Sequence, residues 1–297
     1  MELQLNKKEN ITKENVTIDK KQKDWVKVLK KALLYFILIF GVLITFFPFY
    51  YMIVLATRSV EEIFNFPPPL WFGNAAQENI QILLDKLPFF QNIFNSIIVA
   101  TLATLLVLFF CSLGGYGFAK YNFRGKEKLF FLMLASMMIP PLLSIIPWFI
   151  MMKAFGWINS FKPLIIPGAA NAFGIFLMRQ FMEEIPDEII DAARIDGAGE
   201  FEIYYKIALP LSKPGMATLG ILTFLGSWNN FMGPLLVLQE KTKYTIPVAL
   251  SKLNGNFETP WGATMMGTAL GVFPIVLAFV LASKYFISGL TTGATKG

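Results

Sequence analysis

The chain has 297 residues, of which 55% are hydrophobic and 15% are aromatic, with 30 phenylalanines. This composition is too apolar for an ordinary soluble domain and predicts a membrane protein. The net charge of +6 comes mainly from lysines beside hydrophobic segments, so it does not indicate a nucleic-acid partner. One cysteine and no histidine exclude a disulfide framework, the usual zinc ligands and a serine–histidine nucleophile pair. We therefore expect no metal or cofactor to be held by this chain.

Six apolar segments are long enough to cross a bilayer, which takes about 20 residues per helix. They lie at residues 32–56, 96–118, 129–152, 164–181, 216–238 and 265–287. The expected fold class is therefore an all-α membrane protein with six transmembrane helices. Pro140, Pro141 and Pro147 predict a bend in the third segment. Glycines at 114, 115, 117, 267 and 271 predict close packing between helices.

The expected organisation has four parts: a polar tail at 1–31, the first helix with an outward loop at 32–91, a five-helix core at 92–287 that includes a charged loop at 183–210, and a tail at 288–297. The N-terminal tail is too long and too charged for a cleaved signal peptide, so the first span is expected to stay as an anchor. The first outward loop contains Trp71 and Phe72 beside three prolines, and predicts an interfacial aromatic anchor. A second polar outward loop contains Asn254-Gly255-Asn256.

Lysine and arginine counts predict the orientation of the spans. Nineteen of the 26 fall in the N-terminal tail, the segments after the second and fourth spans, and the C-terminal segment, and seven fall in the alternate loops. Because cytoplasmic loops carry the excess of these residues, both termini and the segment between spans four and five are expected to be cytoplasmic.

The longest charged interruption, residues 186–210, carries a helical pattern of its own. Its predicted apolar face consists of Pro186, Ile189, Ile190, Ala193 and Gly197. Gly197 and Gly199 predict a sharp turn, after which a second short helix is expected from Phe201 to Leu209 and is ended by Pro210. The polar face is acidic, and anionic lipid would repel it, so a docking element for a cytoplasmic protein is favoured over a helix lying on lipid.

The segment DAARIDGAGEFEIYYKIALP resembles the EAA loop of ABC importer permeases. The matching residues are Asp191, Ala192, Ala193, Asp196, Gly197, Ala198, Ile207, Leu209 and Pro210, with Asp191 in place of the usual glutamate. The tail GLTTGATKG resembles the closing segment of the smaller permease of carbohydrate importers. The resemblance implies a type I ABC importer permease fold, in which a helix-turn-helix loop between helices 4 and 5 docks a cytoplasmic ATPase. The docking residues it implies are Asp191, Ala192, Ala193, Arg194, Asp196, Gly197 and Ala198.

The fifth span carries the candidate substrate contacts. Thr223, Ser227 and Asn230 follow i, i+4, i+7 spacing, and hydrocarbon offers such groups no partners, so this face is expected to meet protein or water. With Trp228 and Asn229 beside them, hydroxyls, amides and an aromatic ring fit a neutral sugar. The alternative is that these residues only tie helices together. The SWNNF segment resembles the corresponding span of maltose-type sugar permeases, which favours the sugar pathway.

Energy for transport is expected to come from another chain, because no G-x-x-x-x-G-K-[ST] loop occurs. The resemblance implies a second permease, expected to be a different chain, two cytoplasmic ATPase subunits that bind ATP and magnesium, and an extracytoplasmic sugar-binding protein. Sugar and membrane lipid complete the expected partners. The leading alternative is a stand-alone secondary carrier or channel, which the lack of charged residues inside most spans disfavours. An intramembrane enzyme lacks a nucleophile–base pair.

Overall fold

The computed structural model describes residues 2–253 and 259–294, with side chains described for 27–253 and 259–280. The chain divides into two compact units, Met1–Val54 and Leu55–Gly297. The first is made by helix α1 (Glu2–Ala56), so the predicted polar tail at 1–31 is helical where it is described. Residues 288–294 of the predicted C-terminal tail likewise continue the last helix. The Asn254-Gly255-Asn256 segment lies outside the described residues.

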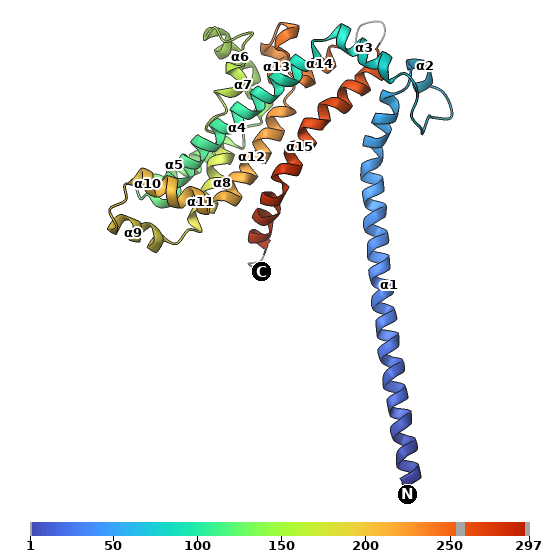
Figure 1. Cartoon of the computed structure of the whole chain (residues 1–297). Helices are drawn as coiled ribbons and strands as arrows, with labels where there is room; N and C mark the ends of the chain where they lie inside the picture. The colour runs from blue at the N-terminus through green and yellow to red at the C-terminus, as the bar shows by residue number, and fades with distance from the viewer. Residues whose placement is uncertain (1, 254–258, 295–297) are drawn as a thin grey trace. The chain divides into compact units, whose positions relative to one another are not determined.

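The second unit is a helical bundle built around one long helix, α4 (Figure 1). Its described elements are α2 (Val60–Ile63), α3 (Ala76–Lys86), α4 (Phe89–Lys120), α5 (Lys126–Ser136), η1 (Pro141–Ser144), α6 (Ile145–Ala154), α7 (Lys162–Ile165), α8 (Ala172–Glu183), α9 (Asp187–Ile195), α10 (Glu200–Ile203), η2 (Tyr204–Ala208), α11 (Leu209–Leu211), α12 (Lys213–Trp228), α13 (Met232–Val237), η3 (Lys241–Lys243), α14 (Ile246–Ser251) and α15 (Trp261–Ala294). α4 packs against α8 and α12, and α15 packs against α12 and α3. All described elements are helical, as the expected fold class requires.

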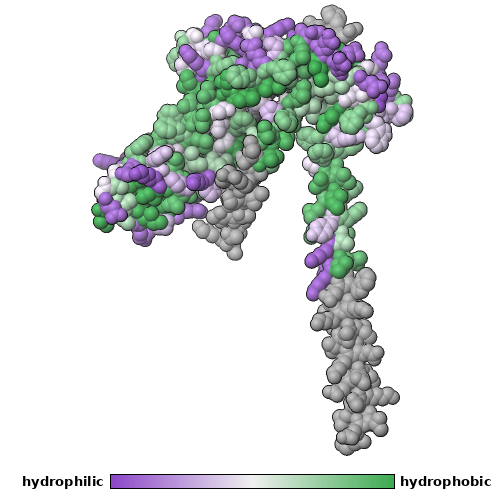
Figure 2. Space-filling view, in the orientation of Figure 1, coloured by the Kyte–Doolittle hydropathy of each residue, from purple (hydrophilic) through white to green (hydrophobic). Residues whose placement is uncertain are grey.

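Fewer continuous spans are present than the six predicted. Within the described residues, three helical stretches are long and apolar enough to cross a membrane: Lys27–Ala56, Phe89–Lys120 and Trp261–Val280. Two bent pairs raise this number to five if each counts as one crossing: Lys126–Ser136 with Pro141–Ala154, bent by 88°, and Glu200–Leu211 with Lys213–Trp228, bent by 78°. Apolar side chains cover the middle of this unit, and polar ones gather toward its two ends (Figure 2).

Prolines account for two of the interruptions. The predicted bend in the third segment is confirmed, because α5 ends before Pro140 and Pro141 begins a short 3-10 helix. Pro147 causes no further break, since it lies in the first turn of α6, where its missing N–H is not needed. The fourth predicted span, 164–181, is divided between α7 and α8 by a stretch that contains Pro167 and a glycine.

Glycines allow the helices of the bundle to approach closely. A Cβ atom placed on Gly115 of α4 would lie 2.6 Å from the Cβ of Met178 in α8 and within 3 Å of that helix's backbone. A Cβ on Gly267 of α15 would lie 2.6 Å from the side chain of Leu250. The predicted close packing is therefore confirmed at these two positions. At Gly117, by contrast, an added Cβ meets none of the described atoms within 4 Å.

At the end of α4 opposite α9, three polar side chains on one face of the helix hold a loop by its backbone. Asn92 and Asn95 donate their amide hydrogens to carbonyls of residues 241–244 at 2.8 to 3.1 Å. The Ser96 hydroxyl accepts a hydrogen bond of 2.8 Å from the N–H of Ile246. All three side chains are buried, and these bonds give the two amide nitrogens and the Ser96 hydroxyl the partners that water would otherwise supply.

The loop between α1 and α3, predicted to face outward, carries exposed aromatic side chains, and its backbone is bonded to Arg58. The Arg58 guanidinium donates to the carbonyl of Trp71 at 2.8 and 3.1 Å, while Phe66 is 93% exposed and Trp71 75% exposed. Phe64 packs edge-on against Trp261, the first residue of α15, with ring centroids 6.2 Å apart. The loop is therefore packed against the start of α15 through Phe64, and the interfacial anchor stays a prediction.

Candidate functional site

The acidic segment predicted as a hairpin forms two helical limbs joined by a tight turn (Figure 1). α9 begins after Pro186, and acidic residues fill its first turn, where the helix macrodipole favours negative charge. It ends at Ile195 with Asp196 as its C-cap, and Gly197 follows with a φ of +83°, a left-handed backbone that glycine adopts without strain. Gly199 has an ordinary φ of −70° and precedes α10. Of the two glycines predicted to form the turn, only Gly197 uses the freedom that is special to glycine.

The second limb is longer than predicted, and Pro210 does not end it. α10 passes into a π-helix, in which the N–H of Leu209 bonds to the carbonyl of Tyr204 five residues back. Pro210 then lies in the first turn of α11, where no N–H is required, and the limb continues to Leu211. The direction changes by 78° between this limb and α12, at the buried Ser212.

The inner faces of both limbs pack into the main apolar cluster of the bundle. Ile190 of α9, Ile203 of α10 and Tyr204 are buried against Met178 and Met182 of α8. The apolar face predicted for α9 is narrower than expected, since Pro186 and Ile189 are exposed. Burying one face in this way fixes the hairpin on the bundle and leaves its opposite side to solvent.

Arg194 joins the two limbs through ion pairs. Its Nε donates to Glu200 in α10 at 2.8 Å, and its Nη1 donates to Asp191, three residues back in α9, at 3.0 Å. The hydrogen bond from Arg194 is the main reason why the pKa of Glu200 lies below its usual value, and a bond from Tyr121 adds to this effect. Glu200 is therefore ionised at neutral pH, and the turn is closed by charge-assisted bonds.

The side of the hairpin that faces solvent presents the predicted docking residues. Of the seven predicted, five are exposed and two, Ala193 and Ala198, are half-buried against the apolar cluster. Ile195, at 86% exposure, and Phe201, at 67%, lie on either side of the turn. The docking residues predicted from the sequence do not include Ile195 or Phe201. The available signal was an isoleucine outside the apolar face of α9.

The predicted pathway residues do not all lie on one helical face. α12 ends at Trp228, and Asn230 lies beyond it, where its side-chain oxygen accepts a 3.3 Å hydrogen bond from the N–H of Gly233. The i, i+4, i+7 interpretation is therefore wrong for Asn230, because the helix stops two residues before it. Thr223 and Ser227 do share a face of α12, and neither hydroxyl has a hydrogen-bond partner among the described residues.

Asn229 and Trp228 have opposite environments although they are neighbours in the chain. Asn229 is exposed at the C-terminal end of α12, whereas Trp228 is only 2% exposed. The Trp228 ring stacks on Phe224 with centroids 5.9 Å apart. Trp228 thus packs inside the bundle at the end of α12 and has almost no exposed surface that a ligand could contact.

Asn230 lines a hollow of about 350 Å³ where the breaks in three predicted spans meet. Ser144 and Trp148 of the third span and Gly168 of the fourth also line it. A hydroxyl, an indole and an amide around one hollow can bind a sugar, since they combine hydrogen bonds with a flat apolar face. Sequence analysis missed Ser144 and Trp148, although a serine and a tryptophan among prolines in an apolar run were a usable signal.

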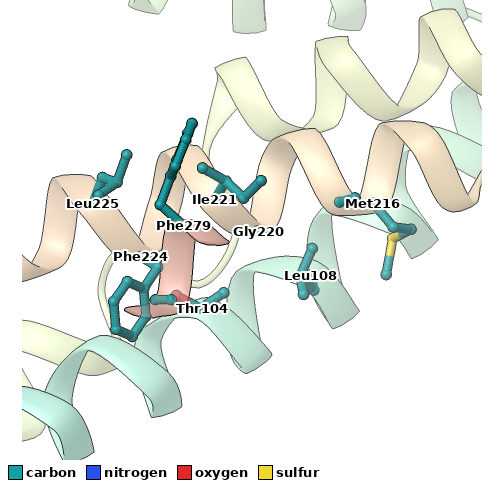
Figure 3. A pocket seen from close by; sticks show the side chains of 10 residues that line it. Thr104, Leu108, Met216, Gly220, Ile221, Phe224, Leu225 and Phe279 are labelled. Atoms are coloured by element: carbon teal, nitrogen blue, oxygen red, sulfur yellow. The ribbon is translucent and has the colours of Figure 1, made fainter. Parts of the chain in front are cut away.

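A second hollow, of about 400 Å³, lies between α4, α12 and α15 (Figure 3). Leu108, Met216, Phe224 and other apolar side chains line it. Its one side-chain hydroxyl, that of Thr104, donates to the carbonyl of Ala100 at 2.7 Å. This lining offers apolar contact but no side-chain donor for a sugar, so the hollow beside Asn230 is the better candidate.

The sequence profile of the family described as "Binding-protein-dependent transport system inner membrane component" matches residues 111–291. The chain belongs to this family. The matched part of this inner membrane component begins in α4 and includes the hairpin, α12 and the hollow beside Asn230. The resemblance noted from the sequence is thereby confirmed, and the chain is a permease component of a transport system.

Three curated relatives show the kind of protein that this inner membrane component is similar to. An arabinooligosaccharides transport system permease protein of Bacillus subtilis is 37% identical over 209 residues, 70% of this chain and 74% of the relative. A lactose transport system permease protein of Rhizobium radiobacter is 30% identical, with 86% and 93% covered. A trehalose/maltose transport system permease protein of Thermococcus litoralis is 30% identical, with 91% and 99% covered.

Solved structures agree with the fold. A chain of a bacterial ABC transporter involved in import of the acidic polysaccharide alginate has a TM-score of 0.75 and 25% identity, with 87% of this chain and 96% of that chain covered. A chain of the MetNI methionine ABC transporter has a TM-score of 0.52 at 15% identity, which shows a likeness of fold alone. The helical arrangement is thus that of an ABC importer permease.

Proposed function

We propose that this chain is a permease subunit of an ATP-driven, binding-protein-dependent importer of sugars, with a di- or oligosaccharide as cargo. One observation carries the proposal. This chain belongs to the permease family, and its hairpin packs on the bundle by its inner face while its acidic face, with the turn at Gly197, is exposed to solvent. The names of the relatives support the class of cargo, since they include arabinooligosaccharides, lactose and trehalose/maltose.

The proposed topology has six crossings with both termini in the cytoplasm. Support comes from the three continuous apolar helices, the two bent pairs and the division of the fourth segment between α7 and α8. Irregular backbone at membrane depth is tolerated where it lines a cavity, and the broken segments around the hollow beside Asn230 fit this requirement. The excess of lysine and arginine on one side supports the orientation.

The proposed partners are a second permease, different from this chain, two cytoplasmic ATPase subunits and an extracytoplasmic sugar-binding protein. ATP and magnesium would be bound by the ATPases, and this chain would contribute half of the pathway. The proposed docking surface consists of Asp191, Ala192, Ala193, Arg194, Asp196, Gly197 and Ala198. To these we add Ile195 and Phe201, because an exposed apolar side chain beside a turn offers a partner area to bury.

The proposed sugar pathway follows α12 to the hollow at its end. Thr223 and Ser227 offer hydroxyls that are not used within the described chain, and Asn229 and Asn230 offer amides. Ser144 and Trp148 complete the lining from the third span. Trp228, which the sequence also predicts as a pathway residue, is proposed to hold the end of α12 in place by its buried packing on Phe224.

Purification of the intact chain from its own membrane in a mild detergent tests this function. We expect an ATPase and a second permease to co-purify, and ATP hydrolysis by the complex to rise with a binding protein and one of a panel of di- and oligosaccharides. Sugar flux through liposomes that contain this chain alone would contradict the proposal and favour the stand-alone carrier or channel.

Removing polar groups along the pathway should weaken sugar transport by a modest factor. Each of Ser227→Ala and Asn230→Leu is expected to lose about 0.5–1.5 kcal/mol of hydrogen bonding, or roughly two- to twelvefold in the sugar concentration needed for half-maximal uptake. Thr218→Val is the control, because its hydroxyl bonds to Pro214 within the same helix at 2.9 Å. Equal uptake curves for all three variants would exclude this pathway.

A further inference from the structure

The last residue of α4 fastens that helix to the beginning of the hairpin. The Lys120 ammonium donates to the backbone carbonyl of Ile185 and to the carboxylate of Asp187, the latter at 2.7 Å. Its side chain is only 4% exposed. A charge removed from water to this degree depends on its partners, although the Asp187 side chain itself is 79% exposed. It joins α4 to the first turn of α9.

The next residue reaches the other limb. The Tyr121 hydroxyl donates to Glu200, the first residue of α10, at 2.7 Å, and the same carboxylate is paired with Arg194 of α9. Partial burial and the neighbouring carboxylate raise the pKa of Tyr121 to about 12, so the hydroxyl keeps its proton at neutral pH. Two consecutive residues at the end of α4 thus hold both limbs of the hairpin.

A third contact lies deeper in the same place. The Ser112 hydroxyl in α4 and the Tyr204 hydroxyl in the second limb form a buried hydrogen bond of 2.7 Å. The ring of Tyr116 packs between Tyr204, at 5.4 Å, and Tyr121, at 5.8 Å. Side chains of Ser112, Tyr116 and Tyr121, spread over about two and a half helical turns along and just after α4, therefore lie against the second limb and restrict its movement relative to α4.

The covalent routes out of the hairpin are less direct. Toward α12 the chain passes through a π-helical turn and a 78° bend at Ser212, and toward α8 it passes through residues 184–186, which are not helical. Turns and bends of this kind are where segments flex when one body moves against another. α4, in contrast, is one helix of 32 residues that packs along α8 and α12.

We infer that Lys120 and Tyr121 are positioning residues that make the docking hairpin and α4 move as one body, so that a displacement of the hairpin reaches the helices of the pathway. This inference rests on the proposed function, because the displacement is that imposed by an ATPase. Without the two side chains, the apolar packing and the Ser112–Tyr204 bond would remain, and more of the motion would be absorbed at the bend and the turn. The ATPase would still bind, but less of the displacement that it imposes on the hairpin would be transmitted to α12.

The test uses the assembled transporter in liposomes with its ATPase, partner permease and binding protein. Tyr121→Phe removes one oxygen and keeps the ring, and Lys120→Met keeps the length of the side chain. We expect both variants to retain the ATPase and its hydrolysis, while sugar imported per ATP falls about two- to tenfold in each and further in the double variant. Lys206→Met is the matched control, since it breaks an exposed pair with Glu202 inside the hairpin, at 2.6 Å. It should leave the ratio unchanged.

The outcomes separate the two proposals. If the wild-type chain does not assemble with an ATPase subunit, the proposed function and this inference are both overturned. If the wild type and the double variant import the same amount of sugar per ATP hydrolysed, the inference alone is overturned. If Lys120→Met fails to accumulate in the membrane, Tyr121→Phe still decides the question, because a normal ratio of sugar to ATP in that variant contradicts a positioning role for its hydroxyl.

Discussion

Gly197→Asp is expected to abolish sugar uptake while the chain still inserts into the membrane in normal amounts. An added Cβ at this position meets none of the described atoms within 4 Å, so the new side chain projects freely from the turn. It would occupy the space that a docked partner needs, and it would add negative charge to a segment that is already acidic. Uptake of labelled sugar by cells, with immunoblots of the membrane fraction, measures both effects.

Two further substitutions separate the charge from the backbone strain. Gly197 has a φ of +83°, which costs an ordinary L-residue about 1–2 kcal/mol but asparagine less. Gly197→Asn should therefore be milder than Gly197→Asp, because it has nearly the same shape without the charge. Gly197→Ala should show the effect of strain with the smallest side chain. Uptake at the wild-type rate by the aspartate variant would mean that the turn does not dock an ATPase.

Gly115→Ala is expected to destabilise the fold strongly, because it forces two packed helices apart. The added Cβ would lie 2.6 Å from the Cβ of Met178 and 2.8 Å from the backbone nitrogen of Arg179. Backbone atoms cannot turn away as a side chain can, so α4 and α8 must move apart. Overpacking of this kind costs about 1–3 kcal/mol, and a rigid contact lies at the upper end of this range. Thermal unfolding of the purified chain in detergent measures the loss.

Gly117→Ala is the matched control for Gly115→Ala. It adds the same methyl group to the same helix two residues away, where no described atom lies within 4 Å. Alanine also has the better helix propensity, so this variant should be as stable as the wild type or slightly more stable. Equal unfolding temperatures for the two variants would show that α4 and α8 are not packed as closely as the structure indicates.

The hairpin could be predicted from sequence because its signals are local. The periodic apolar residues, the proline before Asp187 and the glycine at 197 all act within a few residues of themselves. The contacts that fasten it to α4 could not be predicted in this way. Lys120 and Asp187 are 67 residues apart, and Tyr121 and Glu200 are 79 apart, so only the packed bundle brings them together.

The pathway was only partly predictable for a similar reason. Hydropathy averages over a window and reports that a segment is apolar, but it does not report where the helix stops. Spacing alone therefore puts Asn230 on the face of Thr223 and Ser227, although α12 ends at Trp228. The hollow that Asn230 lines is formed by breaks in three different segments, which no single window of sequence contains.

The loop at residues 241–246 is anchored by the buried side chain of Ile246, and α4 binds its first part through peptide groups, because Asn92, Asn95 and Ser96 bond to loop carbonyls and to one N–H. Peptide groups are the same whatever side chain is attached to them. Evolution can therefore exchange the exposed side chains at 241 and 242 without loss of the shape of the loop. Relatives that handle different cargo should diverge in sequence at these positions while they keep a common backbone trace.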